Sequence, residues 1–369
     1  MDAFFASVEL LSYPELRGKP VVVGGRRVDQ PERQADGCYR FARLRDYVGR
    51  GVVTTSTYEA RALGVHSAMG IMKSAQLAPD AILLPANFEA YRDCSRRFKA
   101  AVASIAPKIE DRGIDEIYID LSELPDDSET LAWRLKEAVA AATGLTCSIG
   151  ISPNKLLSKI CSDLEKPNGT TILQESDIAR RIWPLAARKI NGIGPKASEK
   201  LTRLGIHTIG DLAGAPLELL VRHFGNATGN WMHDAAHGID HRPVVTERDT
   251  KSVSRETTFE RDLHPRQDRE RLSELFTRLC QQVAEDLRRK GYCGRTIGIK
   301  LRFDDFSTVS RDLTLPAPLD DGAGIRRAAG ECLKRIALDK KIRLLGVRAS
   351  NLVSASALGP RSVQQVLDF

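Results

Sequence analysis

The sequence predicts an α+β protein built from several domains. Its 369 residues are too many for one typical domain of about 150 residues. Three patterns follow one another along the chain. Apolar runs alternate with amphipathic stretches up to about residue 175, helical periodicity fills residues 175–241, and residues 251–355 alternate between strand and helix patterns in the order βαββαβ.

Composition narrows the class of protein. Hydrophobic residues make up 42% of the chain and charged residues 28%, which is ordinary for a folded soluble protein. The net charge of +7 is compatible with a polyanionic partner such as nucleic acid. Seven scattered cysteines without a CxxC pair, and a start without the features of a signal peptide, predict reduced thiols in the cytoplasm. No apolar run approaches the ~18 residues that span a bilayer, so we expect no membrane partner.

The first region mixes strand and helix patterns. PVVVGG and AILLP have the composition of strands, and FEAYRDCSRRFKAAVASIA has the three- and four-residue spacing of a helix. An Arg-rich insertion occupies residues 24–51, and its Gly and Pro content predicts a loop with one short helix at YRFARLRDYV. The insertion carries no motif that predicts its role.

Two adjacent acids, Asp115 and Glu116, begin the β-rich run GIDEIYIDL. Neighbouring residues of a regular strand point to opposite faces, so both carboxylates can serve one ion only at a turn or a strand end. Gly113 favours such a turn. Paired carboxylates suit Mg²⁺, a hard cation that takes oxygen ligands and keeps substrate phosphates in its shell. In isolation such a pair is usually a surface turn, so its meaning depends on the segments around it.

Cationic residues flank this run on both sides. SIGISPNKLLSKICSDLEKPNG predicts a strand, a helix capped by Ser152 or Asn154, and a rigid turn that exposes Lys166. Upstream, TTSTYEARALGVHSAM places Tyr58 and Arg61 three residues apart, on one face of a helix. A hydroxyl, a guanidinium and an ammonium together can hold a triphosphate, although each is a weak signal alone.

The helical region contains INGIGPKASEKLTRLGIHTIGDL, which resembles a helix–hairpin–helix motif. Gly192 and Gly194 allow a close backbone approach, and Lys196 begins the second helix, whose N-terminal amides can face a phosphate. A plain tight turn between packed helices explains this segment equally well by itself.

The last region contains the alternating strand TIGIKLRF, in which the apolar residues occupy one face. Lys300 and Arg302 share the other face. A sheet with its helices on one side leaves the second face open, and these basic side chains can then meet a phosphate backbone. Taken alone, the strand is better explained by an ordinary solvated face.

Six segments, in this order, resemble the motifs of the Y-family DNA polymerases, in the group of bacterial DNA polymerase IV: DAFFASVE, TTSTYEARALGVHSAM, GIDEIYIDL, SIGISPNKLLSKICSDLEKPNG, INGIGPK and GIKLRFDDF. They span nearly the whole chain. The resemblance implies a right-handed polymerase with palm, small fingers, helical thumb and a βαββαβ little finger. The expected domains are the start of palm and fingers at 1–18, fingers at 19–82, palm at 83–174, thumb at 175–241, a linker at 242–250, little finger at 251–355 and a clamp-binding tail at 356–369.

The resemblance also implies the roles of single residues. Asp115 and Glu116 would be the catalytic acids and would bind two Mg²⁺ ions. The incoming nucleotide would contact Tyr58, Arg61, Lys166, Phe4 and Phe5, with Phe5 excluding a 2′-hydroxyl. Periodicity alone assigns both phenylalanines to the core. Contacts to DNA would come from Gly192, Gly194, Lys196, Lys300 and Arg302.

The implied reaction is attack of a primer 3′-hydroxyl on the α-phosphorus of a deoxynucleoside triphosphate, with pyrophosphate leaving. Small fingers imply low-fidelity translesion synthesis, and no second acidic cluster suggests a proofreading nuclease. We expect a monomer whose partners are primer–template DNA, deoxynucleoside triphosphates and a sliding clamp. The last residues, RSVQQVLDF, offer Gln364, Leu367 and Phe369 as a short peptide that can fill a pocket on the clamp.

One departure from the family pattern lies at the start. The family has an Asp-x-Asp pair before the two aromatics; its second acid aligns with Asp2. The first acid, a metal ligand, would lie one residue before Met1, on a palm strand that is missing. We therefore expect the printed chain to have little polymerase activity and an upstream start to restore it. Equal primer extension by both forms would contradict this expectation.

Two other functions compete with a translesion polymerase. One is a catalytically impaired DNA- and clamp-binding relative, which the retained acids and nucleotide-binding residues disfavour. The other is a Mg²⁺ nuclease using the same acids, which the aromatic pair does not support. Primer extension with deoxy- versus ribonucleotides separates the three.

Overall fold

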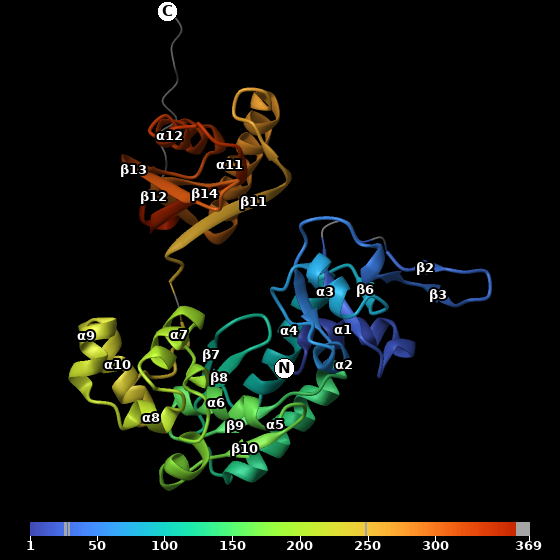
Figure 1. Cartoon of the computed structure of the whole chain (residues 1–369), viewed down its shortest axis with the longest axis vertical. Helices are drawn as coiled ribbons and strands as arrows, with labels where there is room; N and C mark the ends of the chain where they lie inside the picture. The colour runs from blue at the N-terminus through green and yellow to red at the C-terminus, as the bar shows by residue number, and fades with distance from the viewer. Residues whose placement is uncertain (26–27, 29, 248, 359–369) are drawn as a thin grey trace, which may run out of the picture. The chain divides into compact units, whose positions relative to one another are not determined.

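The chain divides into two compact units, Met1–Glu247 (unit 1), which contains several apolar cores, and Arg248–Phe369 (unit 2), which is built around one (Figure 1). This computed structural model describes residues 1–25, 28, 30–247 and 249–358. Among the described residues, no helix is both long and apolar enough to cross a bilayer.

Unit 1 begins with helix α1 (Phe4–Ser12), which packs beside a four-stranded sheet of order β4-β6-β1-β5. The predicted strands PVVVGG and AILLP are confirmed as β1 and β6, which pair in parallel. The sheet strands are β1 (Val21–Gly24), β4 (Ala42–Arg43), β5 (Val53–Ser56) and β6 (Ile82–Leu84). The remaining elements here are the hairpin β2 (Glu32–Arg33) and β3 (Tyr39–Arg40), helices α2 (Tyr58–Ala62) and α3 (Ile71–Leu77), and 3₁₀ turns at Pro14–Leu16 and Leu44–Asp46.

The short helix predicted at YRFARLRDYV is wrong. This stretch forms β3, β4 and a 3₁₀ turn instead. Ala42 and Arg43 pair antiparallel with Leu83 and Ile82, which lie far along the chain. A distant partner strand thus overrides the local pattern, which is common where strand formation depends on packing.

The middle of unit 1 packs two long helices, α4 (Phe88–Ala103) and α5 (Ser128–Thr143), over two small sheets. One sheet is the antiparallel pair β7 (Ile109–Asp111) and β8 (Ile117–Ile119). The other is the parallel pair β9 (Ile149–Ile151) and β10 (Thr170–Ile172). Phe98, Val102, Leu135 and Val139 from the two helices form the core that joins both sheets.

Helix α6 (Lys155–Leu164) connects this region to the helical region that follows. Of its two candidate caps, Asn154 is the one whose side chain accepts the Leu157 amide (3.0 Å). The predicted apolar stripe of α6 packs into one core with the following helices. Those elements are a 3₁₀ turn (Glu175–Asp177), a π-helical turn (Ile178–Ile182), a 3₁₀ turn (Ala187–Lys189), α7 (Pro195–Arg203), α8 (Ile209–Ala213), α9 (Leu217–Phe224) and α10 (Asn226–Ala236). The opposite face of α6 is left for polar residues.

A buried ion pair ties the end of unit 1 to its centre. Glu110 on β7 is fully buried and accepts hydrogen bonds from the Lys155 ammonium (2.7 Å) and the Val245 amide (3.0 Å). Lys155 also donates to the Pro243 carbonyl (2.6 Å), so both partners of the pair hold the chain after α10. Arg112 approaches the second oxygen of Glu110 at 3.3 Å.

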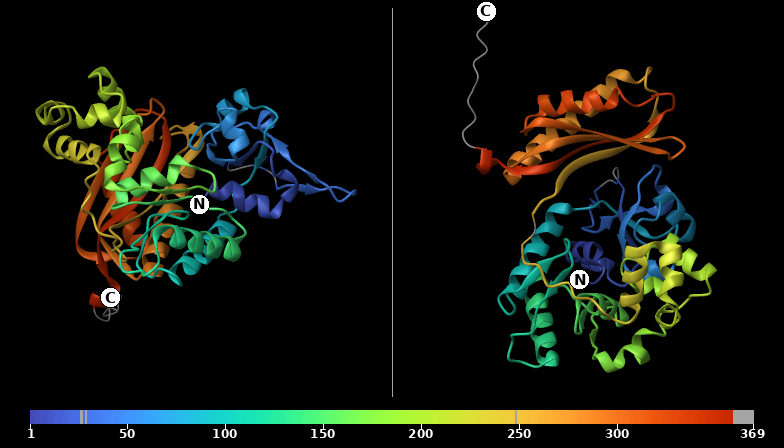
Figure 2. Two further views of the ribbon diagram at one scale, coloured as in Figure 1. Left: turned by 90° about the horizontal axis from the view of Figure 1, so that it is seen from below. Right: turned by 90° about the vertical axis from the view of Figure 1, so that its left-hand side faces the viewer.

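Unit 2 has the predicted order βαββαβ, with two helices on one face of a four-stranded sheet (Figure 2). Its elements are β11 (Ser252–Leu263), α11 (Arg269–Lys290), β12 (Tyr292–Phe303), β13 (Thr308–Leu319), α12 (Gly322–Leu333), β14 (Ile342–Ser354) and a 3₁₀ turn (Ala355–Leu358). The strand order is β11-β14-β12-β13, and every neighbouring pair is antiparallel. Each βαβ unit is therefore split by one inserted strand.

The buried pair predicts that replacing Glu110 will lower the free energy of unfolding much more than replacing an exposed acid of unit 1. Glu110→Ala leaves the Lys155 ammonium buried without its carboxylate, so we expect the free energy of unfolding to fall by about 3–5 kcal/mol. Glu123→Ala, which breaks the exposed Lys108–Glu123 pair, should leave the free energy of unfolding nearly unchanged. All three tryptophans lie in unit 1, so their fluorescence during urea unfolding measures both variants. Equal losses would show that Glu110 is not a buried partner in solution.

Candidate active site

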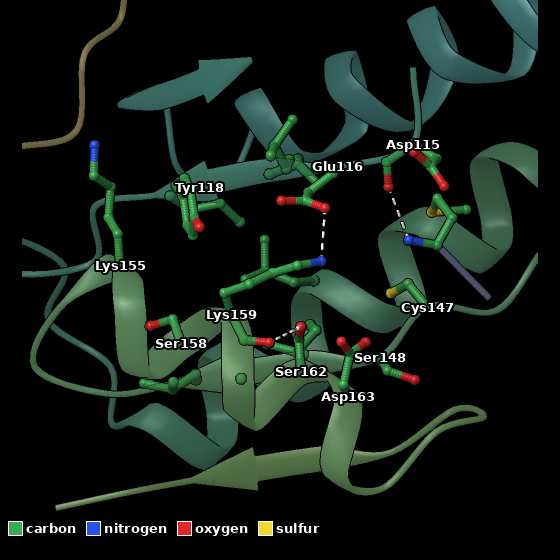
Figure 3. Close-up of a pocket in the computed structure, with 18 of the residues that line it drawn as sticks. Asp115, Glu116, Tyr118, Cys147, Ser148, Lys155, Ser158, Lys159, Ser162 and Asp163 are labelled. Atoms are coloured by element: carbon green, nitrogen blue, oxygen red, sulfur yellow. Dashed lines mark hydrogen bonds and ion pairs between the residues drawn. The ribbon is translucent and has the colours of Figure 1, made fainter. Parts of the chain in front are cut away.

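A cavity of about 890 Å³ opens in unit 1 between α1, α2, the β7–β8 connection and α6 (Figure 3). Its wall contains all seven residues for which the sequence predicts catalysis, metal binding or nucleotide binding: Phe4, Phe5, Tyr58, Arg61, Asp115, Glu116 and Lys166. These residues are scattered over more than 160 positions of the sequence. The fold thus brings together groups that no local pattern connects.

The two acids lie where the chain bends between β7 and β8. Residues 113–115 form the bend, and Glu116 directly precedes β8. The pair therefore lies at a turn and a strand end, the arrangement in which neighbouring side chains can serve one site. The α-amino group of Met1 donates a hydrogen bond to the Asp115 carbonyl oxygen (2.9 Å).

Glu116 already has a cationic partner. The Lys159 ammonium lies 2.7 Å from a Glu116 oxygen, and Figure 3 shows the two side chains pointing toward each other across the cavity. Burial opposes the charged form of Lys159, but the hydrogen bond and charge of Glu116 outweigh it and raise the pKa of Lys159 above its ordinary value.

Lys159 was not predicted from the sequence, although a signal for it exists. Lys155, Lys159 and Ser162 follow at intervals of four and three, which places them on the polar face of α6 opposite its apolar stripe. Asp163 also lines the cavity, 3.8 Å from the Lys166 ammonium. The polar face of α6 therefore forms one wall of the site.

Asp2 is buried beneath the cavity, and its carboxylate is fully occupied. It accepts hydrogen bonds from the hydroxyls of Ser148 (2.7 Å) and Thr146 (3.0 Å) and from the Asn168 amide (2.9 Å). Lys166 lies 3.4 Å away. Burial would raise the pKa of Asp2, but these hydrogen bonds and the Lys166 charge hold it below its ordinary value. Asp2 is thus used to join three segments of unit 1.

The aromatic floor of the cavity consists of Phe4 and Phe5. Phe4 is only 3% exposed and belongs to the core, whereas Phe5 is half-buried. The ring of Phe5 stacks on Tyr91 with centroids 4.3 Å apart and planes inclined by 25°. The Tyr91 hydroxyl donates to the buried Glu9, and burial raises the pKa of that carboxyl. Helices α1 and α4 are therefore locked together directly beneath Phe5.

The residue before α1 has a strained backbone. Ala3 adopts a left-handed conformation with φ of 40°, which is unusual for a residue with a side chain. The sharp turn lets Asp2 point into the protein while Phe4 and Phe5 reach the cavity. Strain of this kind is often stored at functional sites, where the surrounding contacts hold it.

Tyr58 and Arg61 share one face of α2, as predicted. The Arg61 guanidinium lies 4.9 Å from the centre of the Tyr58 ring and donates to the Ser56 carbonyl (3.1 Å). The Tyr58 hydroxyl is buried and has no hydrogen-bond partner among the residues the structure describes. Burial, with the Asp2 charge acting in the same direction, raises the pKa of Tyr58. An unpartnered buried hydroxyl facing a cavity suits a ligand oxygen.

The remaining predicted site residues lie elsewhere. Gly192, Gly194 and Lys196 form the turn at the start of α7 and do not line the cavity. Gly192 has φ of 120°, and a Cβ there would lie 2.6 Å from the Trp231 ring, so only glycine fits. Lys300 and Arg302 belong to β12 of unit 2. Gln364, Leu367 and Phe369 lie outside the described residues.

Asp115 and Glu116 have the chemistry of a partial metal site. In the described part of the chain, no group of three or more His, Cys, Asp or Glu side chains is placed to hold an ion alone. Mg²⁺ commonly takes one or two protein carboxylates and completes its shell with substrate phosphates and water. Asp115 and Glu116 supply two, and Glu116 already attracts a cation. The donor set fits a hard divalent cation whose remaining ligands come from water or substrate oxygens.

The Asp2 network predicts a pH-dependent contribution to stability. A carboxyl whose folded pKa is lowered stabilises the fold above its unfolded pKa of about 3.9, and loses this effect as the pH falls through the folded value. We expect Asp2→Asn to cost about 1–3 kcal/mol at pH 7, because an amide nitrogen then faces hydrogen-bond donors. The cost should shrink below pH ~4. Urea unfolding at both pH values measures it, and a cost independent of pH would contradict the assignment.

Comparisons with known proteins agree with this architecture. Residues 1–163 match the impB/mucB/samB family, residues 188–240 the thumb domain of DNA polymerase-iota, and residues 250–363 the C-terminal domain of the impB/mucB/samB family. The chain is 40% identical over 357 residues to a DNA polymerase IV of Streptomyces coelicolor, covering 95% of this chain and 70% of that protein. It is 37% identical over 361 residues to a DNA polymerase IV of Alkalilimnicola ehrlichii, covering 96% and 94%.

A solved structure is similar to this fold along most of the chain. The Y-family DNA polymerase chimera Dbh-Dpo4(243-245)-Dbh superimposes with a TM-score of 0.80 and 26% identity, over 96% of this chain and 97% of that one. The resemblance and the fold class predicted from the sequence are confirmed. The chain belongs to the impB/mucB/samB family of Y-family DNA polymerases.

Proposed function

We propose that the chain carries out template-directed translesion DNA synthesis, with low fidelity and without proofreading. The observation that carries this proposal is one cavity in which two carboxylates lie with the cations Arg61 and Lys166 and with an aromatic floor at Phe5. The acids suit a phosphate-bound metal, the cations suit a triphosphate, and the floor suits a sugar. A deoxynucleoside triphosphate is a substrate that presents all three parts.

The reaction forms a bond between the primer 3′-oxygen and the α-phosphorus, and breaks the bond from that phosphorus to the leaving pyrophosphate. The hydroxyl proton passes from the attacking oxygen to solvent water. Asp115 and Glu116 would hold Mg²⁺, two ions by analogy with the family. Bound there, Mg²⁺ would supply positive charge to the attacking and leaving oxygens. In the free protein, the Lys159 ammonium balances the negative charge of Glu116.

The protein side chains position the nucleotide and balance its charge. Arg61 and Lys166 place positive charge beside the triphosphate, and the Tyr58 hydroxyl can donate to a phosphate oxygen. Phe5 lies against the sugar, where its ring leaves no room for a 2′-hydroxyl. Tyr91 supports Phe5 from below, so the ring cannot retreat without disturbing a buried stack.

Contacts to the primer–template would come from two regions. The glycine turn before α7, with Lys196, offers helix N-terminal amides to a phosphate. Lys300 and Arg302 offer charge from the open face of β12. We propose further that the chain acts as a monomer and that Gln364, Leu367 and Phe369 bind a sliding clamp, since a short peptide with one polar and two apolar anchors can fill a pocket.

The first test of this function is primer extension by acid variants. Asp115→Asn and Glu116→Gln each remove a carboxylate from the reacting centre, so we expect kcat to fall by about 10²–10³-fold below the low rate expected of the unchanged chain. DNA affinity should stay within about two-fold, because no phosphate contact is lost. Glu123→Gln makes the same charge change outside the cavity and is the control. DNA binding without any extension by the unchanged chain would favour the catalytically impaired relative.

The second test concerns the sugar. Phe5→Ala opens the floor of the cavity, so we expect the preference for deoxy- over ribonucleotides to fall by about 10- to 200-fold, the usual range for filling or emptying part of a pocket. Phe41→Ala removes an equal side chain outside the cavity and should leave the preference unchanged. The ratio of kcat/KM for the two nucleotides is the measurement. An unchanged ratio in Phe5→Ala would reject the assignment of Phe5.

A further inference from the structure

The sheet of unit 2 has an open face on the side away from α11 and α12. The strand register places Thr296, Gly298, Lys300 and Arg302 of β12 on this face, because the alternate residues Ile297, Ile299, Leu301 and Phe303 enter the helix-covered core. Cross-strand partners continue the open face onto the neighbouring strands. They include Glu256 on β11, Arg348 on β14 and Asp312 on β13.

Two ion pairs lie flat on this face. Lys300 and Glu256 stand on strands separated by β14, and their side chains meet above Gly346 with the ammonium 2.9 Å from the carboxylate. Arg348 and Asp312 stand on strands separated by β12 and meet above Gly298, with one guanidinium nitrogen 3.0 and 3.1 Å from the two carboxylate oxygens.

A glycine lies beneath each pair. A Cβ at position 298 would lie 1.9 Å from an oxygen of Asp312, and a Cβ at position 346 would lie 3.0 Å from the Cβ of Glu256. Any side chain at position 298 would therefore displace the carboxylate. The Arg348–Asp312 pair therefore depends on the absence of a side chain at position 298, and the Lys300–Glu256 pair leaves little room for one at position 346.

Stability does not explain these pairs. All four charged side chains are exposed, from 38% for Lys300 to 50% for Glu256 and Arg348, and exposed pairs contribute little to folding. Their effect falls on binding, because each carboxylate neutralises a cation that a DNA phosphate would otherwise contact. Arg302 differs, since it donates a hydrogen bond to the neutral Thr308 hydroxyl (3.1 Å).

We propose that Glu256 and Asp312 act as built-in competitors of DNA phosphates and weaken the grip of this face on primer–template DNA. The inference rests on the proposed function, in which Lys300 and Arg302 contact the DNA backbone. A phosphate that approaches Lys300 or Arg348 must share the cation with the carboxylate paired to it or displace that carboxylate. The face therefore keeps its basic side chains ordered while limiting the affinity, which shortens the time the protein spends on DNA.

The test is the affinity of the full chain for a primer–template duplex at a fixed salt concentration of about 0.1 M. Glu256→Gln and Asp312→Asn remove the competing charge and keep the shape, and we expect each to tighten binding by about 2- to 5-fold. Glu331→Gln is the matched control. Glu331 pairs with Lys334 on α12, on the covered side of the sheet, so this variant makes the same change in net charge away from the open face.

A double-mutant cycle separates competition from general attraction. In a Lys300→Met background, Glu256→Gln should no longer tighten binding beyond Glu331→Gln, because the cation that it releases is gone. If Glu256→Gln and Glu331→Gln behave alike in the unchanged background, the competition is rejected. If Lys300→Met and Arg302→Met leave DNA affinity unchanged, the proposed DNA contact of this face fails instead. Circular dichroism of each variant checks that the sheet is intact.

Discussion

The geometry of the cavity depends on one buried carboxylate. Asp2 accepts hydrogen bonds from the segment that enters β9 and from the turn that follows α6, while it stands itself at the start of α1. Helix α1 carries Phe5, and the turn carries Lys166. The Asp2 side chain therefore fixes the distance between Phe5 and Lys166. Hydrogen bonds are directional, so a fully satisfied buried group fixes this spacing more sharply than apolar packing alone would.

Helix α6 connects the cavity to the rest of unit 1 through contacts on both of its faces. Its apolar face packs into the core of the following helical region. Two lysines on its polar face, one turn apart, each hold an acid of the β7–β8 hairpin: Lys155 binds Glu110 and Lys159 binds Glu116. The first pair is buried and also holds the chain after α10, whereas the second is partly exposed in the cavity. One short helix thus attaches the β7–β8 hairpin to the scaffold through the buried Glu110 pair and leaves the Glu116 pair accessible in the cavity.

Much of this could be read from the sequence, and the omissions have physical causes. Periodicity found α4, α6 and the elements of unit 2, because amphipathic patterns are local. The motifs identified the residues of the cavity through resemblance, whereas periodicity alone would have assigned Phe5 to the core. The pairs Lys159–Glu116, Lys155–Glu110 and Lys300–Glu256 were not predicted, since each depends on a contact between distant segments. The strand at Ala42–Arg43 was missed for the same reason, because its partner is β6.

The unpartnered hydroxyl of Tyr58 lowers the stability of the free protein but is available to bind a ligand. A buried polar group without a partner destabilises the free protein, and a ligand oxygen that accepts its hydrogen bond removes this penalty. A nucleotide that accepts this hydrogen bond would therefore bind more tightly, because it removes the penalty of the unpaired Tyr58 hydroxyl. Phenylalanine at this position would avoid the penalty, so a tyrosine here is better explained by a ligand that accepts the hydrogen bond than by the stability of the free protein.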